Sequence, residues 1–413
     1  MIKIAVLGLG NRGRVYGNQF NIHEGVKIVS VCDKFQEKID NIREKWNVPV
    51  EACFTDEEKF FAQGKIADAM VICTQDRDHY GHAMKALELG YNIMLEKPVS
   101  PVLQECLDIE AKAKEKGVNV IVCHVLRYSN LFRKIHDLIA SGILGDVKLI
   151  RHNEDVSYWH FSHSYVRGNW RRSDETTPLL MAKCCHDMDL LYWYAGARAK
   201  KINSYGDLSF FTEANAPEGA TPLCKDCPHK DTCIYEARLQ YLGRGDKPRK
   251  FPWGVYAFST KETREDIAEK IQTGPYGRCV FKCDNNVCDC QTVNIEFENN
   301  IRAVFTVSAF NEDNYRFIYV NGTKGELFAD DRKSVVTVRV FGEDEPREYV
   351  VGDKIDEAGH SGGDEGIADA VVRLIRGEYV PDATYIKDTI ESHRMVLAAE
   401  ESRLEGGKLI ELL

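Results

Sequence analysis

Hydrophobic and polar positions along the first 125 residues alternate between two kinds of segment. Short apolar runs predict strands, namely "IKIAVLG", "VKIVSVCD", "VEACF", "DAMVICT", "YNIMLE" and "VNVIVCH". Longer amphipathic stretches of helical length lie between them, for example residues 77–90 and 103–117. This repeated alternation of strand and helix predicts an α/β domain at residues 1–125, built on a doubly wound parallel sheet of the Rossmann type.

The pattern changes after His124. The elements predicted beyond it are helices at 127–140, 179–195, 364–376 and 383–405, a strand near 146–156, and alternating strands between 291 and 340. Short connections such as "NN" and "NGTKG" favour antiparallel hairpins. Residues 126–413 are therefore predicted to form an α/β substrate-binding and oligomerisation domain. We expect it to have a largely antiparallel open sheet and a cysteine-bearing insertion at about 212–290.

Composition narrows the class of protein. The chain has 413 residues, of which 44% are hydrophobic and 29% charged, as in an ordinary globular protein of two domains. Its net charge of −10 argues against a nucleic-acid partner, whose phosphates call for a basic face. No apolar run reaches the roughly 20 residues that span a bilayer. The first strand leads directly into a glycine turn instead of a cleavage site, so we expect a cytoplasmic location.

The segment "GLGNRG" places Gly8, Gly10 and Gly13 in a G-x-G-x-x-G pattern after the first predicted strand. In a dinucleotide site these glycines allow a tight turn, close approach of the backbone to the pyrophosphate, and helix–strand contact. The following helix offers N–H groups and a partial positive charge to phosphates. Asp33 ends the second strand, where a carboxylate can accept both ribose hydroxyls and repel a 2′-phosphate. The site is predicted to favour NAD, although Lys34 keeps NADP open.

A lysine follows the fifth predicted strand in the segment "LEKPVS". Ligands of open α/β sheets bind at the carboxyl ends of strands, and Pro98 restricts the backbone of Lys97. A lysine held there, partly desolvated and near a cationic nicotinamide ring, would have a lowered pKa suited to proton transfer. A turn with a solvated lysine is the alternative. The predicted cofactor contacts besides the glycines and Asp33 are Asn11, Arg12, Thr74, His79, Glu96 and Lys97.

These features occur together in one known family. The glycine turn, the acid after the second strand, "EKP" after the fifth, "RY" at Arg127–Tyr128 and a histidine-bearing helix resemble the Gfo/Idh/MocA family. Its members include glucose–fructose oxidoreductase and inositol dehydrogenases, and the resemblance spans nearly the whole chain. It implies a Rossmann domain and an α/β domain whose open sheet often forms a homodimer or homotetramer. It also implies nicotinamide-dependent chemistry on sugars or cyclitols, with the EKP lysine and the helix histidine beside the reacting carbon.

The segment "LMAKCCHDMDLL" puts four ionisable residues into an otherwise apolar helix. Lys183, His186 and Asp187 are spaced i, i+3 and i+4, and so share one face. Asp189 is placed to orient the ring of His186. The family usually has an aspartate four residues before the histidine, where this chain has Ala182. We predict that His186 and Lys183 are catalytic, with Lys183 taking over part of the role of the aspartate. The alternative is a helix with one solvent-exposed face.

Predicted substrate contacts are mostly aromatic or basic, because aromatic rings stack on sugars and arginines bind hydroxyls or carboxylates. The loop "HFSHSYVRGNWRR" supplies two of them, although it can equally anchor a subunit contact. The predicted contacts are Arg127, Tyr128, Trp170, Arg171 and Asp187. Nearer the C-terminus, His360 is placed to reach the cleft, and Asp364 suits a helix N-cap.

Half of the 14 cysteines lie in two short polar segments of the predicted insertion. Cys224, Cys227 and Cys233 form a C-x2-C-x5-C cluster. Without an export signal, cysteines are more often thiols or metal ligands than disulfides. Three or four thiolates arranged tetrahedrally form a structural zinc site. We therefore predict zinc at Cys224, Cys227, Cys233 and Cys283, although the spacing does not determine the fourth ligand. An iron–sulfur cluster and free thiols are the alternatives.

Three functions are compatible with these residues. The leading one is an NAD(P)-dependent oxidoreductase that transfers a hydride between a ring carbon of a sugar or cyclitol and the nicotinamide, with Lys97 and His186 moving the hydroxyl proton. The second is an NAD-dependent glycosidase, in which transient oxidation permits elimination. This hypothesis is favoured by the departure from the family pattern at Ala182, where the aspartate is missing, and by the additional Lys183. The third is a non-catalytic NAD-binding sensor, in which Lys97 would be replaceable without loss of function.

Overall fold

The computed structural model describes residues 1–412, except 247–248, 251–253, 353–359 and 361. It divides into two compact units. Unit 1 comprises Met1–His136, Met188–Leu190 and Val351–Arg394, and unit 2 comprises Asp137–Asp187, Leu191–Val350 and Met395–Leu413. Most of the last two helices thus belong to the same unit as the first strands, whereas the predicted domains divide the chain once, at residue 125.

Unit 1 is built on a six-stranded parallel sheet with the order β3-β2-β1-β4-β5-β6. Its strands are β1 (Ile2–Leu7), β2 (Val26–Cys32), β3 (Cys53–Phe54), β4 (Ala69–Ile72), β5 (Asn92–Leu95) and β6 (Val120–Val122). The predicted doubly wound sheet is confirmed. The predicted strand "VEACF" shrinks to two residues, because a 3-10 turn at Val50–Ala52 occupies its start. Leu7 pairs with both Cys32 and Ile72, so the carboxyl ends of the central strands lie level.

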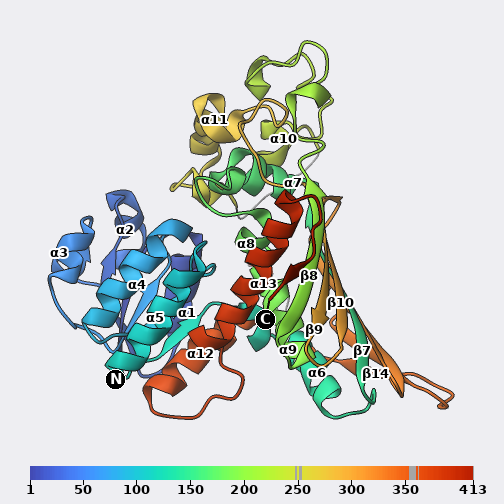
Figure 1. Ribbon diagram of the computed structural model, residues 1–413. Helices are drawn as coiled ribbons and strands as arrows, with labels where there is room; N and C mark the ends of the chain where they lie inside the picture. The colour runs from blue at the N-terminus through green and yellow to red at the C-terminus, as the bar shows by residue number, and fades with distance from the viewer. Residues whose placement is uncertain (247–248, 251–253, 353–359, 361, 413) are drawn as a thin grey trace. The chain divides into compact units, whose positions relative to one another are not determined.

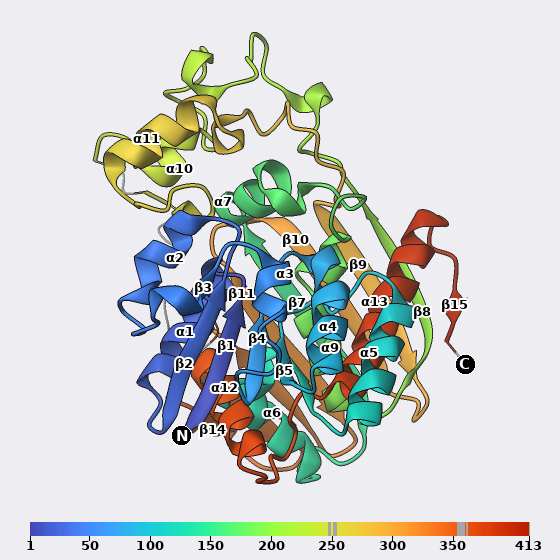
Figure 2. The ribbon, with the colours of Figure 1, turned by 90° about the vertical axis from the view of Figure 1, so that its left-hand side faces the viewer.

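Helices cover both faces of this sheet (Figure 2). They are α1 (Asn11–Ile22), α2 (Gln36–Arg43), α3 (Glu57–Phe61), α4 (His79–Glu88), α5 (Leu103–Lys116), α12 (Gly363–Ile375) and the first part of α13 (Ile386–Leu404). One core joins α1, α2 and α12 to the sheet through residues such as Tyr16 and Ile367. The other joins α3, α4 and α5 to the opposite face. Each fully buried large apolar side chain contributes about 1.5–3 kcal/mol, so α12 is bound firmly into this unit.

Unit 2 is built on a nine-stranded sheet (Figure 1). Its strands are β7 (Val147–Ser157), β8 (Ala199–Asp207), β9 (Cys290–Phe297), β10 (Arg302–Asn311), β11 (Tyr315–Gly322), β12 (Gly325–Asp330), β13 (Val335–Val340), β14 (Arg347–Val350) and β15 (Ile410–Glu411). The order is β14-β13-β12-β11-β7-β10-β9-β8-β15. The pair β7–β10 is parallel and the other named pairs are antiparallel, which confirms the predicted largely antiparallel sheet. The "NGTKG" turn joins β11 to β12, a strand that the sequence analysis missed.

The remaining helices are short. They are α6 (Asn130–Ala140), α7 (Tyr158–Phe161), α8 (Leu179–Ala182), α9 (Cys185–Ala195), and, in the insertion between β8 and β9, α10 (Ala237–Tyr241) and α11 (Arg264–Thr273). Single turns of 3-10 or π type occupy Asp76–Asp78, Val125–Tyr128, Ser162–Arg167, Asn169–Arg171, Glu213–Asn215, Cys224–Asp226, Gly254–Ala257 and Pro275–Gly277. In Figure 1, α10 and α11 lie together within the insertion. No helix in the described part of the chain is long and apolar enough to cross a membrane.

The helix predicted over 179–195 is interrupted. α8 ends at Ala182 and α9 begins at Cys185, because the backbone of Cys184 leaves helical geometry with ψ of 10°. The expectation of one continuous face for Lys183, His186 and Asp187 is therefore wrong. Lys183 and Asp187 are instead linked through partners on strands β7 and β11.

Candidate active site

The glycine turn of unit 1 leaves space for a ligand only at its middle residue. Gly8 has a φ of +91°, and a Cβ there would lie 2.4 Å from the carbonyl oxygen of Cys73. A Cβ at Gly13 would lie 1.9 Å from the carbonyl oxygen of Gly8, whereas one at Gly10 would meet nothing within 4 Å. Gly10 is the N-cap of α1 and makes no side-chain capping hydrogen bond. The backbone N–H groups of the first turn can therefore donate hydrogen bonds to phosphate oxygens. This geometry fits a dinucleotide pyrophosphate.

Asp33 lies beside this turn, at the end of β2. Its Oδ2 accepts a hydrogen bond of 2.7 Å from the backbone N–H of Leu9, and its Oδ1 accepts one of 2.9 Å from that of Phe35. The side chain of Lys38 approaches Oδ2 to 3.7 Å. Each carboxylate oxygen retains a further lone pair, because it can accept two hydrogen bonds. The carboxylate is thus fixed in direction and still able to accept ribose hydroxyls.

Glu96 joins the glycine-turn helix to the predicted catalytic lysine. Its Oε1 accepts hydrogen bonds from Nε of Arg12 at 3.0 Å and from the hydroxyl of Tyr16 at 2.9 Å. Its Oε2 accepts the backbone N–H of Lys97 at 2.7 Å. Burial alone would raise the pKa of Glu96, but Arg12 and Lys97 outweigh it and lower that pKa. Glu96 is therefore an anion that orients the backbone at Lys97. We call Gly8, Gly10, Gly13, Asp33, Glu96 and Lys97 the strand-end site.

Arg12 has a second partner in the C-terminal part of the chain. Its guanidinium binds the carboxylate of Asp364, and Nδ1 of His360 lies 3.1 Å from Oδ2 of the same carboxylate. Burial would raise the pKa of Asp364, but Arg12 and His360 hold it well below its usual range. Asp364 lies in the first turn of α12, whose N-cap is Gly362, so the predicted cap role of Asp364 is wrong. Predicted cofactor residue Arg12 is thus anchored by two carboxylates.

Histidines hold the chain that follows Lys97. The ring of His79 lies 2.7 Å from the carbonyl oxygen of Pro98 and 3.2 Å from that of Thr74. From α13, Nε2 of His393 accepts the backbone N–H of Val99 at 2.9 Å. Burial lowers the pKa of His393 to about 3, which keeps the ring neutral and able to accept this bond. His393 could not be predicted from the sequence, because a single histidine in a long amphipathic helix has no distinguishing pattern.

Arg127 and Tyr128 brace the interior of unit 1. Both Nε and Nη2 of Arg127 donate to Asp189, each at 2.6 Å, and Arg127 is only 4% exposed. The hydroxyl of Tyr128 lies 3.0 Å from that of Thr384. Both oxygens of Asp189 accept from Arg127, which fixes this carboxylate, and the role of Asp189 in orienting His186 stays a prediction. These hydrogen bonds of Arg127 and Tyr128 are internal to unit 1, and their contacts with substrate stay a prediction.

Unit 2 contains a buried charge network formed by five residues. Nζ of Lys183 lies 3.0 Å from Oε1 of Glu154, and Arg316 binds the other oxygen of Glu154. Nε of Arg316 donates to Oδ1 of Asp187 at 2.7 Å, and Nε2 of His152 lies 2.7 Å from the same oxygen. His152 and Glu154 come from β7 and Arg316 from β11, which pair in the sheet. The sheet therefore supplies the partners of the two predicted site residues Lys183 and Asp187.

The members of this network differ in how far their side chains are buried. The side chains of Glu154 and Asp187 are fully buried, whereas that of Lys183 is 16% exposed. Burial would raise the pKa of Asp187, but Arg316 and His152 hold it well below its usual range. Asp187 is thus a buried anion with protein partners, and its contact with substrate stays a prediction. His186 follows on the first turn of α9 and is 5% exposed.

No sequence motif singled out Glu154, His152 or Arg316 as site residues. A partial signal was present, since His152 and Glu154 stand two residues apart and so share one face of β7. Strand patterning cannot show that this face is covered by α8 and α9, because the partners lie about thirty residues or more away in the sequence.

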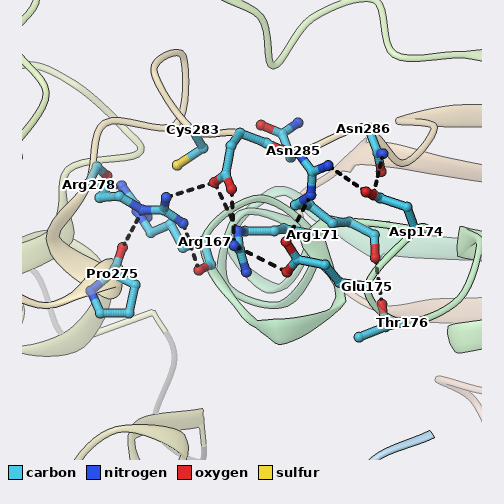
Figure 3. Close-up of polar contacts among 12 residues, drawn as sticks. Arg167, Arg171, Asp174, Glu175, Thr176, Pro275, Arg278, Cys283, Asn285 and Asn286 are labelled. Carbon is cyan, nitrogen blue, oxygen red and sulfur yellow. Dashed lines mark hydrogen bonds and ion pairs between the residues drawn. The ribbon is translucent and has the colours of Figure 1, made fainter. Parts of the chain in front are cut away.

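Trp170 and Arg171 lie in the loop before α8. Nε and Nη2 of Arg171 donate to the two oxygens of Asp284, at 2.9 and 3.0 Å, and Arg278 donates to the same carboxylate at 2.8 Å (Figure 3). The ring of Trp170 packs near that of Tyr165, with centroids 6.3 Å apart. Arg171 therefore links this loop to the insertion, and its predicted contact with substrate has no support from these bonds.

All 14 cysteines lie within the described residues, and all are free thiols. Cys224, Cys227 and Cys233 line one pocket, as the spacing led us to expect, but the fourth thiol that lines it is Cys279. Cys283 instead donates a hydrogen bond from its Sγ to the carbonyl oxygen of Cys279, at 3.2 Å. Within the ranges that the structure describes, no three His, Cys, Asp or Glu side chains are grouped so that they could hold a metal ion. The predicted zinc site is therefore not supported.

Comparison with known proteins covers both units. Residues 2–124 match the family model of the oxidoreductase family with the NAD-binding Rossmann fold, GFO_IDH_MocA, and residues 136–412 match its C-terminal alpha/beta domain. A relative named scyllo-inositol 2-dehydrogenase (NADP(+)) IolW, from Bacillus subtilis, is 28% identical over 180 residues, which are 42% of this chain and 46% of the relative. Another, named 2,7-anhydro-N-acetylneuraminate hydratase, from Mediterraneibacter gnavus, is 24% identical over 202 residues, 49% of this chain and 51% of the relative.

These matches show that the chain spans about half the length of the curated relatives it matches. A solved structure of an oxidoreductase from Agrobacterium radiobacter, in complex with NAD+, L-tartaric acid and magnesium, superposes with a TM-score of 0.71. The alignment covers 99% of this chain and 98% of the other at 14% identity, so it supports the fold alone.

Proposed function

Because the chain belongs to the Gfo/Idh/MocA oxidoreductase family, we propose that it transfers a hydride between a ring carbon of a sugar or cyclitol and a nicotinamide dinucleotide. Gly8, Gly10, Asn11, Gly13 and the start of α1 would hold the pyrophosphate. Asp33 would hold the adenine ribose and favour NAD. When bound, the nicotinamide supplies the site that accepts or donates the hydride. The inositol dehydrogenase among the relatives supports a cyclitol or sugar as substrate.

The observation that carries this proposal is the bridge made by Glu96. One carboxylate binds the guanidinium of Arg12, next to the glycine turn, and the backbone of Lys97. The lysine is thereby fixed relative to the residues proposed for the cofactor, within a single unit. A proton carrier held near a nicotinamide is what oxidation of a hydroxyl requires, because the O–H proton must leave as the C–H hydride is transferred.

We propose that Lys97 and His186 exchange the hydroxyl proton. Lys183 takes part of the role that an aspartate has in relatives, since Ala182 stands in that position here. Glu154 holds the ammonium of Lys183 at 3.0 Å and is itself bound by Arg316, so Lys183 is fixed in position. A fixed cation near the substrate stabilises negative charge that develops on an oxygen atom.

A second candidate is an NAD-dependent glycosidase that oxidises its substrate only transiently. One observation favours it. Lys183 adds a second ionisable side chain three residues before His186 in the sequence, and elimination from an oxidised sugar needs both a base for the C–H and an acid for the leaving group. The relative named as a hydratase is consistent with chemistry that lacks net oxidation.

The test is a screen of the purified full chain with NAD and with NADP over sugars, cyclitols and aryl glycosides. NADH or NADPH absorbance and aglycone release are followed in the same wells. Lys97→Ala and His186→Ala are measured beside the wild type, with thermal unfolding as the check on folding. We expect stoichiometric NADH from a free sugar or cyclitol, and its loss in both variants.

Other outcomes decide between the alternatives. Aglycone release without accumulating NADH would establish the glycosidase. A third outcome is that NAD binds, that neither NADH nor aglycone is produced, and that NAD binding is the same in Lys97→Ala. This outcome would overturn the proposed reaction and favour the non-catalytic NAD-binding sensor.

A further inference from the structure

Thr74 follows β4 at the carboxyl edge of the parallel sheet, and both its hydroxyl and its carbonyl group are held by one helix. Its Oγ1 lies 3.0 Å from Nδ1 of His82, and its carbonyl oxygen lies 3.2 Å from Nε2 of His79. Both histidines belong to α4. Thr74 is only partly buried, whereas His82 is 6% exposed. Thr74 is thus fixed from inside unit 1 and still accessible to a ligand.

A carboxylate contacts the other edge of the His82 ring. Nε2 of His82 lies 2.7 Å from Oε2 of Glu57, the first residue of α3. Nζ of Lys85 donates to the second oxygen of Glu57 at 3.3 Å, and the ring of Phe61 stacks on that of His82 with centroids 6.2 Å apart. Burial would raise the pKa of Glu57, but the hydrogen bonds from His82 and Lys85 lower it. Glu57 is therefore an anion, and the imidazole is held both at its edge and at its face.

The carboxylate decides which nitrogen of His82 carries the hydrogen. An ionised carboxylate has only acceptor atoms, so Nε2 must donate to Glu57. In a neutral imidazole the other nitrogen is then an acceptor, and Nδ1 accepts the hydroxyl hydrogen of Thr74. With this hydrogen directed to His82, Oγ1 of Thr74 offers only lone pairs to a ligand. The hydroxyl therefore recognises hydrogen-bond donors and not phosphate oxygens.

Strand order places this acceptor in the nicotinamide half of the proposed dinucleotide site. β4 lies between β1 and β5, whereas β2, which is followed by Asp33, lies on the opposite side of β1. A Cβ at Gly8 would come within 3.0 Å of the backbone nitrogen of Thr74, so Thr74 adjoins the glycine turn. A dinucleotide with its adenine ribose at Asp33 and its pyrophosphate at the glycine turn would continue toward β4. The first donors beyond the pyrophosphate are the hydroxyls of the second ribose.

We propose that His82 and Glu57 are positioning residues that make Thr74 a hydrogen-bond acceptor for a hydroxyl of the nicotinamide ribose. Thr74 touches the cofactor, whereas His82 and Glu57 act through it. Glu57 keeps the hydrogen of the ring on Nε2, which leaves Nδ1 to accept from Thr74. A phosphate is disfavoured at this position, because the lone pairs of Oγ1 would face those of phosphate oxygens. This inference rests on the dinucleotide site proposed above.

The experiment measures the binding of NAD, ADP-ribose and ADP to the full chain by isothermal titration calorimetry, without substrate. ADP lacks the second ribose, whereas ADP-ribose lacks only the nicotinamide. Thr74→Val leaves a donor of the ligand unpaired, so it should weaken NAD and ADP-ribose about tenfold and leave ADP unchanged. His82→Phe keeps a ring on Phe61 but removes the acceptor at Nδ1, and it should weaken NAD and ADP-ribose about threefold.

A double variant separates positioning from packing. In the Thr74→Val background, His82→Phe should have no further effect on NAD affinity, because the hydroxyl that it orients is gone. Nitrogen-15 NMR of the ring should show the hydrogen on Nε2 in the wild type and a mixture of tautomers in Glu57→Leu. Glu58→Leu removes the next carboxylate of α3, which also binds Lys85. It is the matched control and should keep the wild-type spectrum.

Several results would overturn the proposal. Equal losses from His82→Phe in both backgrounds would show a packing role, and a wild-type ring with a hydrogen on Nδ1 would reject the acceptor. A loss in Thr74→Val for NAD but not for ADP-ribose would reject the ribose as the group recognised. If a variant does not fold, as judged by thermal unfolding, the wild-type NMR spectrum still decides which nitrogen carries the hydrogen.

Turnover measured on the same samples distinguishes this inference from the proposed reaction. An inactive protein with the expected binding pattern would reject the reaction alone. A protein with normal turnover that lacks the pattern would reject this inference alone. A protein that binds neither NAD nor ADP would reject both, because the dinucleotide site itself would be absent.

Discussion

The strand-end site of unit 1 and the buried charge network of unit 2 differ in how their charges are supported. In the strand-end site, short motifs at the carboxyl ends of two strands of one parallel sheet bring Asp33, Glu96 and Lys97 to one edge of the sheet. In the network, Glu154 and Asp187 lie fully buried against a sheet, and their partners come from distant elements. The first arrangement follows from local motifs that one parallel sheet groups at its edge, whereas the second depends on contacts between a sheet and the segments packed on it.

This difference has an energetic consequence. The side chain of Lys97 is only half-buried, so changing it alters binding or chemistry more than folding. A buried ion network is stable only while all its members are present, because removal of one leaves an uncompensated charge in a medium of low dielectric constant. Substitutions in the two regions should therefore separate into effects on turnover and effects on stability.

The largest expected effect on turnover is at Lys97. Lys97→Ala removes a proposed proton carrier and should lower kcat by about 10²–10⁴-fold, since general acid–base groups contribute that much. NAD affinity, measured by NADH fluorescence, should change little, and so should the thermal midpoint. Lys114→Ala, at an exposed position of α5, is the matched control and should retain full activity. Full turnover in Lys97→Ala would remove this residue from the chemistry.

The network should show the opposite behaviour. Glu154→Gln leaves Lys183 and Arg316 without their shared anion, and should lower the free energy of unfolding by about 3–5 kcal/mol. Denaturant unfolding of the full chain measures this change. Glu58→Gln breaks only an exposed pair with Lys85 and should change the same quantity by less than about 1 kcal/mol. Equal effects for the two variants would mean that burial is not what distinguishes Glu154.

A smaller effect is expected for cofactor choice. Asp33→Asn keeps the shape of the side chain but removes the negative charge proposed to repel a 2′-phosphate. The ratio of kcat/KM for NAD to that for NADP should fall about tenfold, which corresponds to about 1.4 kcal/mol. Asp40→Asn, on the exposed side of α2, should leave the ratio unchanged. An unaltered ratio in Asp33→Asn would show that another group selects the cofactor.

The smallest expected effect is a pH-dependent change in stability at Asp331, which lies next to the buried charge network. Burial raises the pKa of Asp331 to about 6, above the value of about 3.9 for an unfolded chain. The folded state therefore binds this proton more tightly, and stability is lost as the pH rises from about 4 through 6. Asp331→Asn should raise the thermal midpoint by about 2–4 °C at pH 7 and leave it unchanged at pH 4.

Asp330, the preceding residue, is a control for which the opposite change in the thermal midpoint is expected. Arg332 lowers the pKa of Asp330, so its carboxylate stabilises the fold at neutral pH and loses that contribution as the pH falls through its folded pKa. Asp330→Asn should lower the midpoint at pH 7. A rise in both variants would point to net charge and not to the burial of Asp331.

Much of unit 1 and of its site could be predicted from the sequence. Strand and helix periodicity, the glycine pattern and the lysine after the fifth strand are local features, because each depends on residues within one turn or one strand. The parallel sheet then brings the ends of β1, β2 and β5 to one edge, so their order in the chain was enough to group Gly8, Asp33 and Lys97. The carboxylate of Glu96 was assigned to the cofactor, although its bond to the Lys97 backbone appears only in the structure.

The sequence by itself thus determined the class of fold, the family and the residues at the strand ends, since short-range sterics and hydrophobic periodicity act over a few residues. Tertiary structure decided the rest. It broke the helix at Lys183, turned Asp189 toward Arg127, placed His393 on the loop after Lys97 and chose Cys279 over Cys283 for the cavity. These outcomes depend on which side chains lie next to each buried charge or thiol. An unpaired buried charge is costly because of desolvation, and its partners are brought to it only when distant segments pack together.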